Sequence, residues 1–150
     1  MAMPRKPGEL IDPLEGVLGH ELRRAALATM TALDALYAPL GLRLQEAIIL
    51  RYVGANPGCH QAAISRALGV TRTNMVPFVS SLVEAGLVVR EVSDGRTHAL
   101  HLTPGGEALC RQLSQILAAY EARLFAGFDA PTREAFAAAL RTVRERASLP

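Results

Sequence analysis

Four consecutive residues near the middle of the chain, Thr71, Arg72, Thr73 and Asn74, carry the kinds of side chain that bind DNA. An arginine can donate two hydrogen bonds to guanine, and an asparagine pairs in a similar way with adenine. A threonine at the start of a helix caps that helix and can also contact a phosphate. The same four residues could also be plain surface groups, so their role depends on the element that positions them.

Residues 64–82 carry these side chains and have the pattern of a helix-turn-helix. A short helix over residues 61–68 is followed by Gly69, which suits the left-handed position at a helix end. Thr71 then caps a second helix. Its core face is formed by four apolar residues at helical spacing, Met75, Phe78, Val79 and Leu82. In this motif the second helix lies in the DNA major groove.

The outward face of the second helix is almost uncharged, and Val76 and Pro77 on it could contact thymine methyl groups. An interior proline removes one backbone hydrogen bond and costs about 3 kcal/mol. If the helix begins at Thr71, Pro77 lies in its second turn and should bend it. If the helix begins at Asn74, the missing N–H costs nothing.

A β-hairpin is predicted directly after the motif, which makes it a winged helix-turn-helix. Residues 87–92 and 97–102 favour strands, and Asp94-Gly95 between them is a strong hairpin signal. Arg96 lies at or beside the tip and is the best single candidate for a DNA contact, while Asp94 forms the turn and pairs locally with it. Arg66 and Arg90 are either phosphate contacts or ordinary surface charges.

Long amphipathic helices flank the winged motif. The first is predicted from Asp12-Pro13 to about residue 40, and two more start at Thr103-Pro104 and within residues 129–132. The first helix is apolar on more than one side, which indicates a dimer. The fold class is therefore mainly α with a small β-hairpin wing. We expect one domain over residues 1–150, with dimerisation helices at 10–40 and 104–148 and a DNA-binding lobe at 42–103.

Net charge, apolar runs and the positions of cysteine and histidine exclude several classes of protein. The net charge of +2 does not by itself indicate a nucleic-acid binder, so the basic groups must be placed locally. No apolar run has the length of a membrane span or a signal core, which predicts a cytoplasmic protein without membrane contact. Cys59 and Cys110 are too few for a disulfide framework, and His98 and His101 should face opposite sides of a strand. Neither an enzyme nor a metal site nor a cofactor is expected.

The order of elements resembles the MarR (multiple antibiotic resistance regulator) family of bacterial transcription factors. The residues that carry the resemblance are Gly41-Leu42-Arg43-Leu44, Asn56-Pro57-Gly58, Leu68-Gly69-Val70-Thr71-Arg72, Leu82-Val83-Glu84-Ala85-Gly86-Leu87-Val88, Asp94-Gly95-Arg96 and Leu100-His101-Leu102-Thr103-Pro104-Gly105-Gly106. The resemblance implies a homodimer bound to the double-stranded DNA of a palindromic operator, usually as a repressor, and released by a small aromatic or phenolic effector. The implied effector pocket lies between the dimerisation helices and the lobe, where the candidate polar residues are His20, Arg24, Tyr37 and Arg51.

The sequence departs from the family pattern in its short wing, which leaves one arginine, Arg96, for the minor groove. We therefore expect a weaker wing contribution. Some family members sense oxidants through a cysteine near the N-terminus, where this chain has none. The predicted DNA contacts are Arg66, Thr71, Arg72, Thr73, Asn74, Val76, Pro77, Arg90, Asp94, Gly95 and Arg96. The alternative function is a winged-helix module that binds a protein partner and not DNA, favoured by the low net charge and the lysine-free outward face.

Overall fold

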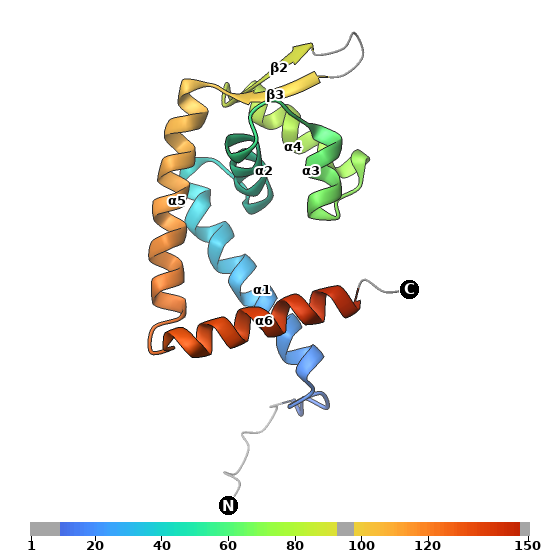
Figure 1. Ribbon diagram of the computed structural model, residues 1–150, viewed down its shortest axis with the longest axis vertical. Coiled ribbons are helices and arrows are strands. Elements are labelled where there is room, and N and C mark those ends of the chain that lie inside the picture. The colour runs from blue at the N-terminus through green and yellow to red at the C-terminus, as the bar shows by residue number, and fades with distance from the viewer. Residues whose placement is uncertain (1–9, 93–97, 148–150) are drawn as a thin grey trace, which may run out of the picture.

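The computed structural model describes residues 10–92 and 98–147. Over these ranges the chain forms α1 (Leu18–Tyr37), the 3-10 helix η1 (Ala38–Leu40), α2 (Leu44–Ala55), β1 (Cys59–His60), α3 (Gln61–Leu68), α4 (Arg72–Glu84), β2 (Val88–Val92), β3 (His98–Leu102), α5 (Pro104–Leu124) and α6 (Ala130–Ala147). Helices α2, α3 and α4 and the sheet form a lobe at one end, and α1 and α5 extend away from it (Figure 1).

Helix α2 lies at the centre of the lobe. Ile49, Leu50 and Val53 on α2 are fully buried. They pack in one core with Met75 and Val79 of α4, and the same core reaches the sheet and α5. Burying side chains of this size contributes about 1.5–3 kcal/mol each, so this core fixes α4 against the rest of the lobe.

The turn between α3 and α4 forms as the sequence predicts. Gly69 ends α3 with φ of 62°, in the left-handed region that glycine tolerates. The Thr71 hydroxyl caps α4 by accepting a hydrogen bond from the Asn74 N–H at 3.3 Å. Because α4 begins at Arg72, Pro77 lies inside the helix and cannot donate to the carbonyl of Thr73. A helix beginning at Asn74 is therefore excluded.

The first long helix begins later than predicted from Asp12-Pro13. Residues 13–16 form turns, and Gly16 adopts φ of 80°, which is incompatible with an α-helix. Helix α1 therefore starts at Leu18, with Val17 at the N-cap position. Asp12 does not cap this helix. Its carboxylate accepts a hydrogen bond from the Leu14 N–H at 2.9 Å and binds side chains of α1.

The sheet has three strands in the order β1-β3-β2, whereas the sequence predicted only the hairpin. Strand β1 pairs antiparallel with β3 through Cys59 with Leu100 and His60 with Ala99. Two residues are too few to display an alternating pattern, so this strand could not be recognised in advance. In the β2–β3 register His98 pairs with Val92 and His101 with Val89, so the two histidines face opposite sides as expected.

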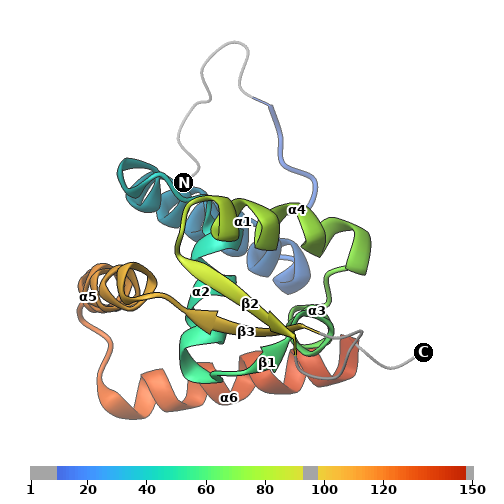
Figure 2. The ribbon, with the colours of Figure 1, turned by 90° about the horizontal axis from the view of Figure 1, so that it is seen from above.

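Helix α6 stands apart from the rest of the chain. It has no buried residue, and it runs back from the end of α5 on the side away from α1 (Figure 2). It contacts the end of α5 through the Phe136 and Phe125 rings, whose centroids lie 6.0 Å apart, and through the Arg133 guanidinium, which donates to the Phe125 carbonyl at 2.8 Å. In the described part of the chain, no single helix could span a bilayer by length and apolarity; one pair, residues 18–40 with 44–55, passes together but is bent by 77°.

The Gly105-Gly106 pair at the start of α5 provides a test of this packing. A Cβ on Gly106 would collide with the carbonyl oxygen of Leu87, whereas a Cβ on Gly105 would meet only the Thr103 hydroxyl, at 3.6 Å. We expect Gly106→Ala to destabilise the fold by about 2–4 kcal/mol, because the backbone at residue 106 and the backbone at Leu87 must move apart. Gly105→Ala should be neutral or stabilising, by up to about 1 kcal/mol. Chemical denaturation of both variants checks this, and equal stabilities would contradict it.

Candidate nucleic-acid interface

A cleft of about 720 Å³ separates the helix-turn-helix from the sheet. Its walls come from α3, the α3–α4 turn, the start of α4, β2 and β3. The charged and titratable residues that line it are His60, Arg66, Arg72, Arg90 and His98. Among the described residues that line this basic cleft, none is acidic. The chain therefore concentrates cations on one surface although its net charge is low.

The predicted contact residues on α4 all point to solvent. Thr71, Arg72, Thr73, Asn74 and Pro77 are exposed. Val76 retains 44% of its surface although it is apolar. The buried side of the same helix carries Met75, Val79 and Leu82. The amphipathic pattern therefore leaves the predicted contact face free to approach a ligand as large as a duplex.

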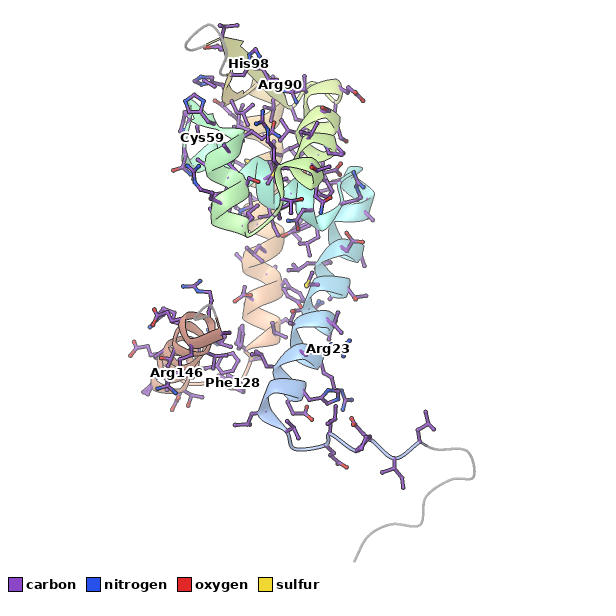
Figure 3. The ribbon with its side chains drawn as sticks, turned by 90° about the vertical axis from the view of Figure 1, so that its right-hand side faces the viewer. Arg23, Cys59, Arg90, His98, Phe128 and Arg146 are labelled. Carbon is purple, nitrogen blue, oxygen red and sulfur yellow. The ribbon has the colours of Figure 1, made fainter. Side chains whose placement is uncertain are left out.

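Two more predicted contacts, Arg66 and Arg90, lie on other walls of the basic cleft, and both are exposed. The Arg90 guanidinium donates a hydrogen bond to the Ser80 hydroxyl at 3.2 Å, which connects β2 to α4. Arg90 and His98 lie at the hairpin end of the lobe (Figure 3). The predicted contacts Asp94, Gly95 and Arg96 lie outside the described residues.

This geometry fits a DNA duplex. The major groove admits an α-helix, and the exposed face of α4 carries donors suited to base edges. A hairpin beside that helix meets the neighbouring minor groove. One phosphate backbone separates the two grooves, so it must pass over whatever lies between the helix and the hairpin. That position is occupied by the basic cleft. The fold and this surface define a winged helix-turn-helix DNA-binding protein.

Comparisons with known proteins identify the family. Residues 40–97 match the family model described as MarR family. The chain is 34% identical over 121 residues to the HTH-type transcriptional repressor Rv2887 of Mycobacterium tuberculosis, covering 79% of this chain and 87% of the relative. The chain therefore belongs to the MarR family and is a DNA-binding transcriptional regulator.

Three solved structures of two proteins extend the comparison. The transcriptional repressor CouR bound to a 23-mer DNA duplex superposes with a TM-score of 0.82 at 31% identity, covering 91% of this chain and 99% of CouR. CouR bound to p-coumaroyl-CoA superposes with a TM-score of 0.81 at 32% identity, covering 91% of this chain and 98% of CouR. Rv2887 in complex with salicylic acid has a TM-score of 0.67 at 32% identity, covering 84% of this chain and 95% of that chain.

The four predicted effector residues form two separate pairs. His20 and Arg24 both contact the Asp12 carboxylate, at 3.2 Å each. Tyr37 lies at the other end of α1, about 25 Å from His20 at 1.5 Å per helical residue. Arg51 reaches the Tyr37 hydroxyl from α2. Within one chain the four residues therefore do not line a single pocket, because the helix on which three of them lie is too long.

Among the four predicted effector residues, Arg51 borders two hollows on the surface. It borders a hollow of about 450 Å³ between α2 and α5 and another of about 320 Å³ along α2. Burial raises the pKa of the Tyr37 hydroxyl, although the charge of Arg51 acts in the opposite direction. The phenol is therefore a neutral hydrogen-bonding group at neutral pH, and Arg51 supplies the positive charge.

Both cysteines are partly buried, Cys59 on β1 and Cys110 on α5. Burial raises the pKa of the Cys59 thiol and of the Cys110 thiol. A raised pKa lowers the fraction of thiolate, which is the reactive form. The Cys110 thiol also lies 3.5 Å from the Leu50 carbonyl. These surroundings fit packing groups and oppose a role in oxidant sensing. In the described ranges, no group of three His, Cys, Asp or Glu residues could hold a metal ion.

Sequence reasoning missed two residues of the basic cleft, His60 and His98. Both lie on strands of the sheet, and the β1–β3 pairing, which sets His60 opposite Ala99 and its ring against the His98 carbonyl, was not predicted. The available clue was the high histidine content around the hairpin, with His98 and His101 on one strand and His60 just before α3.

Proposed function

We propose that the chain acts as a homodimeric repressor that binds a palindromic operator and is released by a small aromatic effector. The observation that supports this best is the exposed apolar surface of α1 and α6 beside a lobe whose described residues form a helix-turn-helix with a basic cleft. In this proposal residues 10–40 and 104–148 form the dimer and residues 42–103 contact the operator. A repressor of this kind needs no catalytic activity and, in a bacterium, acts on the chromosome in the cytoplasm.

The dimer is supported by the distribution of exposed large apolar residues. They gather at the N-terminal end of the chain and along α6, at Leu14, Val17, Leu18, Leu22, Leu27, Met30, Phe136, Leu140 and Val143. Large apolar residues left exposed in such numbers mark an interaction surface. A two-fold dimer presents two copies of α4, and half-sites about one helical turn apart then follow from the geometry.

Arg72 should be a strong determinant of operator binding. It is exposed in the first turn of α4 and also lines the basic cleft. We expect Arg72→Ala to weaken binding by about 1–3 kcal/mol, which is roughly 5- to 150-fold. Arg146→Ala is the matched control, because Arg146 lies at the end of the molecule far from the lobe (Figure 3). Titration of labelled operator DNA by fluorescence anisotropy measures the affinity of both variants. Equal losses of affinity would contradict the assignment of Arg72 as a DNA contact.

The effector proposal rests on the two relatives above 30% identity that bind aromatic acids or their thioesters, salicylic acid in one case and p-coumaroyl-CoA in the other. Both ligands combine an aromatic ring with a negatively charged or acyl group. In this chain Arg51 offers a charge-assisted hydrogen bond beside the Tyr37 hydroxyl and open hollows. An aromatic carboxylate held at Arg51 would lie between the dimerisation helices and the lobe.

A selection experiment tests the function. The full-length protein is used to enrich duplexes from a random pool, and the enriched sequence is then titrated with and without salicylate, p-coumarate and p-coumaroyl-CoA. We expect a palindromic sequence, a binding constant that falls steeply with salt, and release by at least one of these compounds. Failure to enrich any sequence would favour the protein-partner alternative. Enrichment without release would leave DNA binding intact and refute the effector proposal.

A further inference from the structure

We propose that His60 is a contact to the DNA backbone, and that its protonation makes operator binding stronger at lower pH. This inference deepens the proposed function, since it names a further DNA contact and a condition that regulates it. His60 lies on the wall of the basic cleft, where a phosphate backbone would pass between α4 and the hairpin.

The orientation of the His60 ring is fixed by one hydrogen bond. Its Nδ1 lies 3.1 Å from the backbone carbonyl oxygen of His98. A carbonyl oxygen can only accept, so Nδ1 must carry the proton and donate it. In the neutral ring, Nε2 then has a lone pair and no hydrogen. The ring is exposed, so Nε2 is the atom available to a ligand.

A phosphate oxygen discriminates between the two forms of this ring. Phosphate oxygens accept hydrogen bonds, so the lone pair on a neutral Nε2 would be repelled by them. A protonated ring presents Nε2–H and a positive charge, and it keeps the Nδ1–H bond to the His98 carbonyl. The contact therefore forms only with the imidazolium, and DNA binding must take up a proton. Histidine changes charge between about pH 5 and 8, so the effect falls in the physiological range.

The groups around His60 strengthen this coupling. Arg66 on α3, Arg72 on α4 and Arg90 on β2 line the same cleft, together with the imidazole of His98 on β3. These cations attract a phosphate to the cleft, and a phosphate bound there would favour the charged form of the His60 ring. Affinity should therefore rise as the pH falls, because the bound state favours the protonated ring.

A carboxylate in the same row of the sheet as His60, that of Glu91, is engaged with another histidine. Glu91 pairs with Ala99, which in turn pairs with His60, so the three lie in one row across the strands. The Glu91 carboxylate contacts the His101 ring at 3.6 Å. His101 therefore provides a matched control: it is a histidine of the same sheet with a different partner, and it is not among the residues that line the cleft.

The test measures binding of the selected duplex by the wild-type dimer and by His60→Gln, His60→Arg, His98→Gln and His101→Gln at about pH 6 and about pH 8. We expect wild-type affinity to be about threefold to tenfold higher at the lower pH. His60→Gln should lose this increase, and its salt slope at low pH should be smaller by about 1.8, which is about 0.9 for each of the two protomers. His60→Arg should bind tightly at both pH values, because its charge is permanent.

The variants separate this inference from its competitors. His98→Gln keeps the backbone carbonyl that His60 contacts, so it should retain the pH response, as should His101→Gln. A response that disappears in either of these and persists in His60→Gln would overturn the assignment. Wild-type binding that is strong but independent of pH would also overturn it and leave the proposed function standing. Absence of binding to any duplex at both pH values would refute the two together.

Discussion

Leu140→Glu should convert the protein into monomers and weaken operator binding by about a hundredfold or more. Leu140 lies on α6 with 37% of its surface exposed, in a row with Phe136 and Val143 at helical spacing. A carboxylate in the centre of an apolar interface loses its water on association and finds no partner. Each monomer would then bind a single half-site. It would lack the linked second protomer, whose effective concentration at the other half-site is high in the dimer.

The matched control is Ala138→Glu, which places the same charge on the same helix. Ala138 is two residues from Leu140, so it lies on nearly the opposite side of α6, and it is exposed. Analytical ultracentrifugation should give a monomer for Leu140→Glu and a dimer for Ala138→Glu. Circular dichroism should show that both keep their helices, because α6 contributes no residue to the core of the lobe. A dimer that binds DNA normally in spite of Leu140→Glu would contradict the proposed interface.

Most of the fold could be predicted because local sequence and tertiary packing agree. Helices α2 and α3 end at residues that cannot continue them, at Asn56-Pro57-Gly58 and at Gly69. The Thr103 hydroxyl caps α5 by accepting from the Gly106 N–H at 3.0 Å, as expected of Thr-Pro at a helix start. In these places one or two side chains determine the backbone, so the pattern can be recognised in sequence.

The parts that could not be predicted depend on contacts between distant segments. Asp12-Pro13 has the residue types of a helix start, but the Asp12 carboxylate binds His20 and Arg24 instead of capping a helix. The positive φ of Gly16 also prevents a helix from running through this segment. Strand β1 exists only because Cys59 and His60 lie beside β3. For the same reason the basic cleft was predicted only in part. Arg66, Arg72 and Arg90 belong to recognisable motifs, whereas His60 is placed by the long-range pairing.

The junction between α1, α2 and α4 also depends on long-range contacts that the sequence did not predict. The Asp34 carboxylate of α1 accepts from the Leu44 N–H at 2.8 Å, which supplies a cap for α2 from a neighbouring helix. The Arg43 guanidinium lies 4.9 Å from the centre of the Phe78 ring on α4. Glu46 completes the junction, and it is only 3% exposed. Asp34, Arg43, Glu46 and Phe78 therefore connect α1 to α4 through direct contacts.

Glu46→Gln and Glu46→Ala should both destabilise the protein, because the buried carboxylate is the acceptor for three donors. It accepts from the Arg43 N–H and from the Arg43 guanidinium, at 2.9 Å each, and from the Ser81 hydroxyl on α4. Removing it in Glu46→Ala leaves these donors without their acceptor, at a cost of about 2–4 kcal/mol. For a chain of this size the melting temperature should fall by about 5–15 °C. Glu84→Ala, at an exposed glutamate that ends α4, is the control and should change little.

The same carboxylate should give the stability a characteristic pH dependence. Burial raises the pKa of Glu46, but the hydrogen bonds from Arg43 and Ser81 outweigh it and hold the pKa below its ordinary value of 4.5. A group whose pKa is lowered by folding stabilises the protein at pH values above its pKa in the unfolded state. This contribution is lost as the pH falls through its pKa in the folded state. Wild-type stability should therefore fall below about pH 4.5 more steeply than that of Glu46→Gln. Parallel denaturation curves at neutral and acid pH would contradict this, and they would show that the junction between α2 and α4 does not depend on the charge of Glu46.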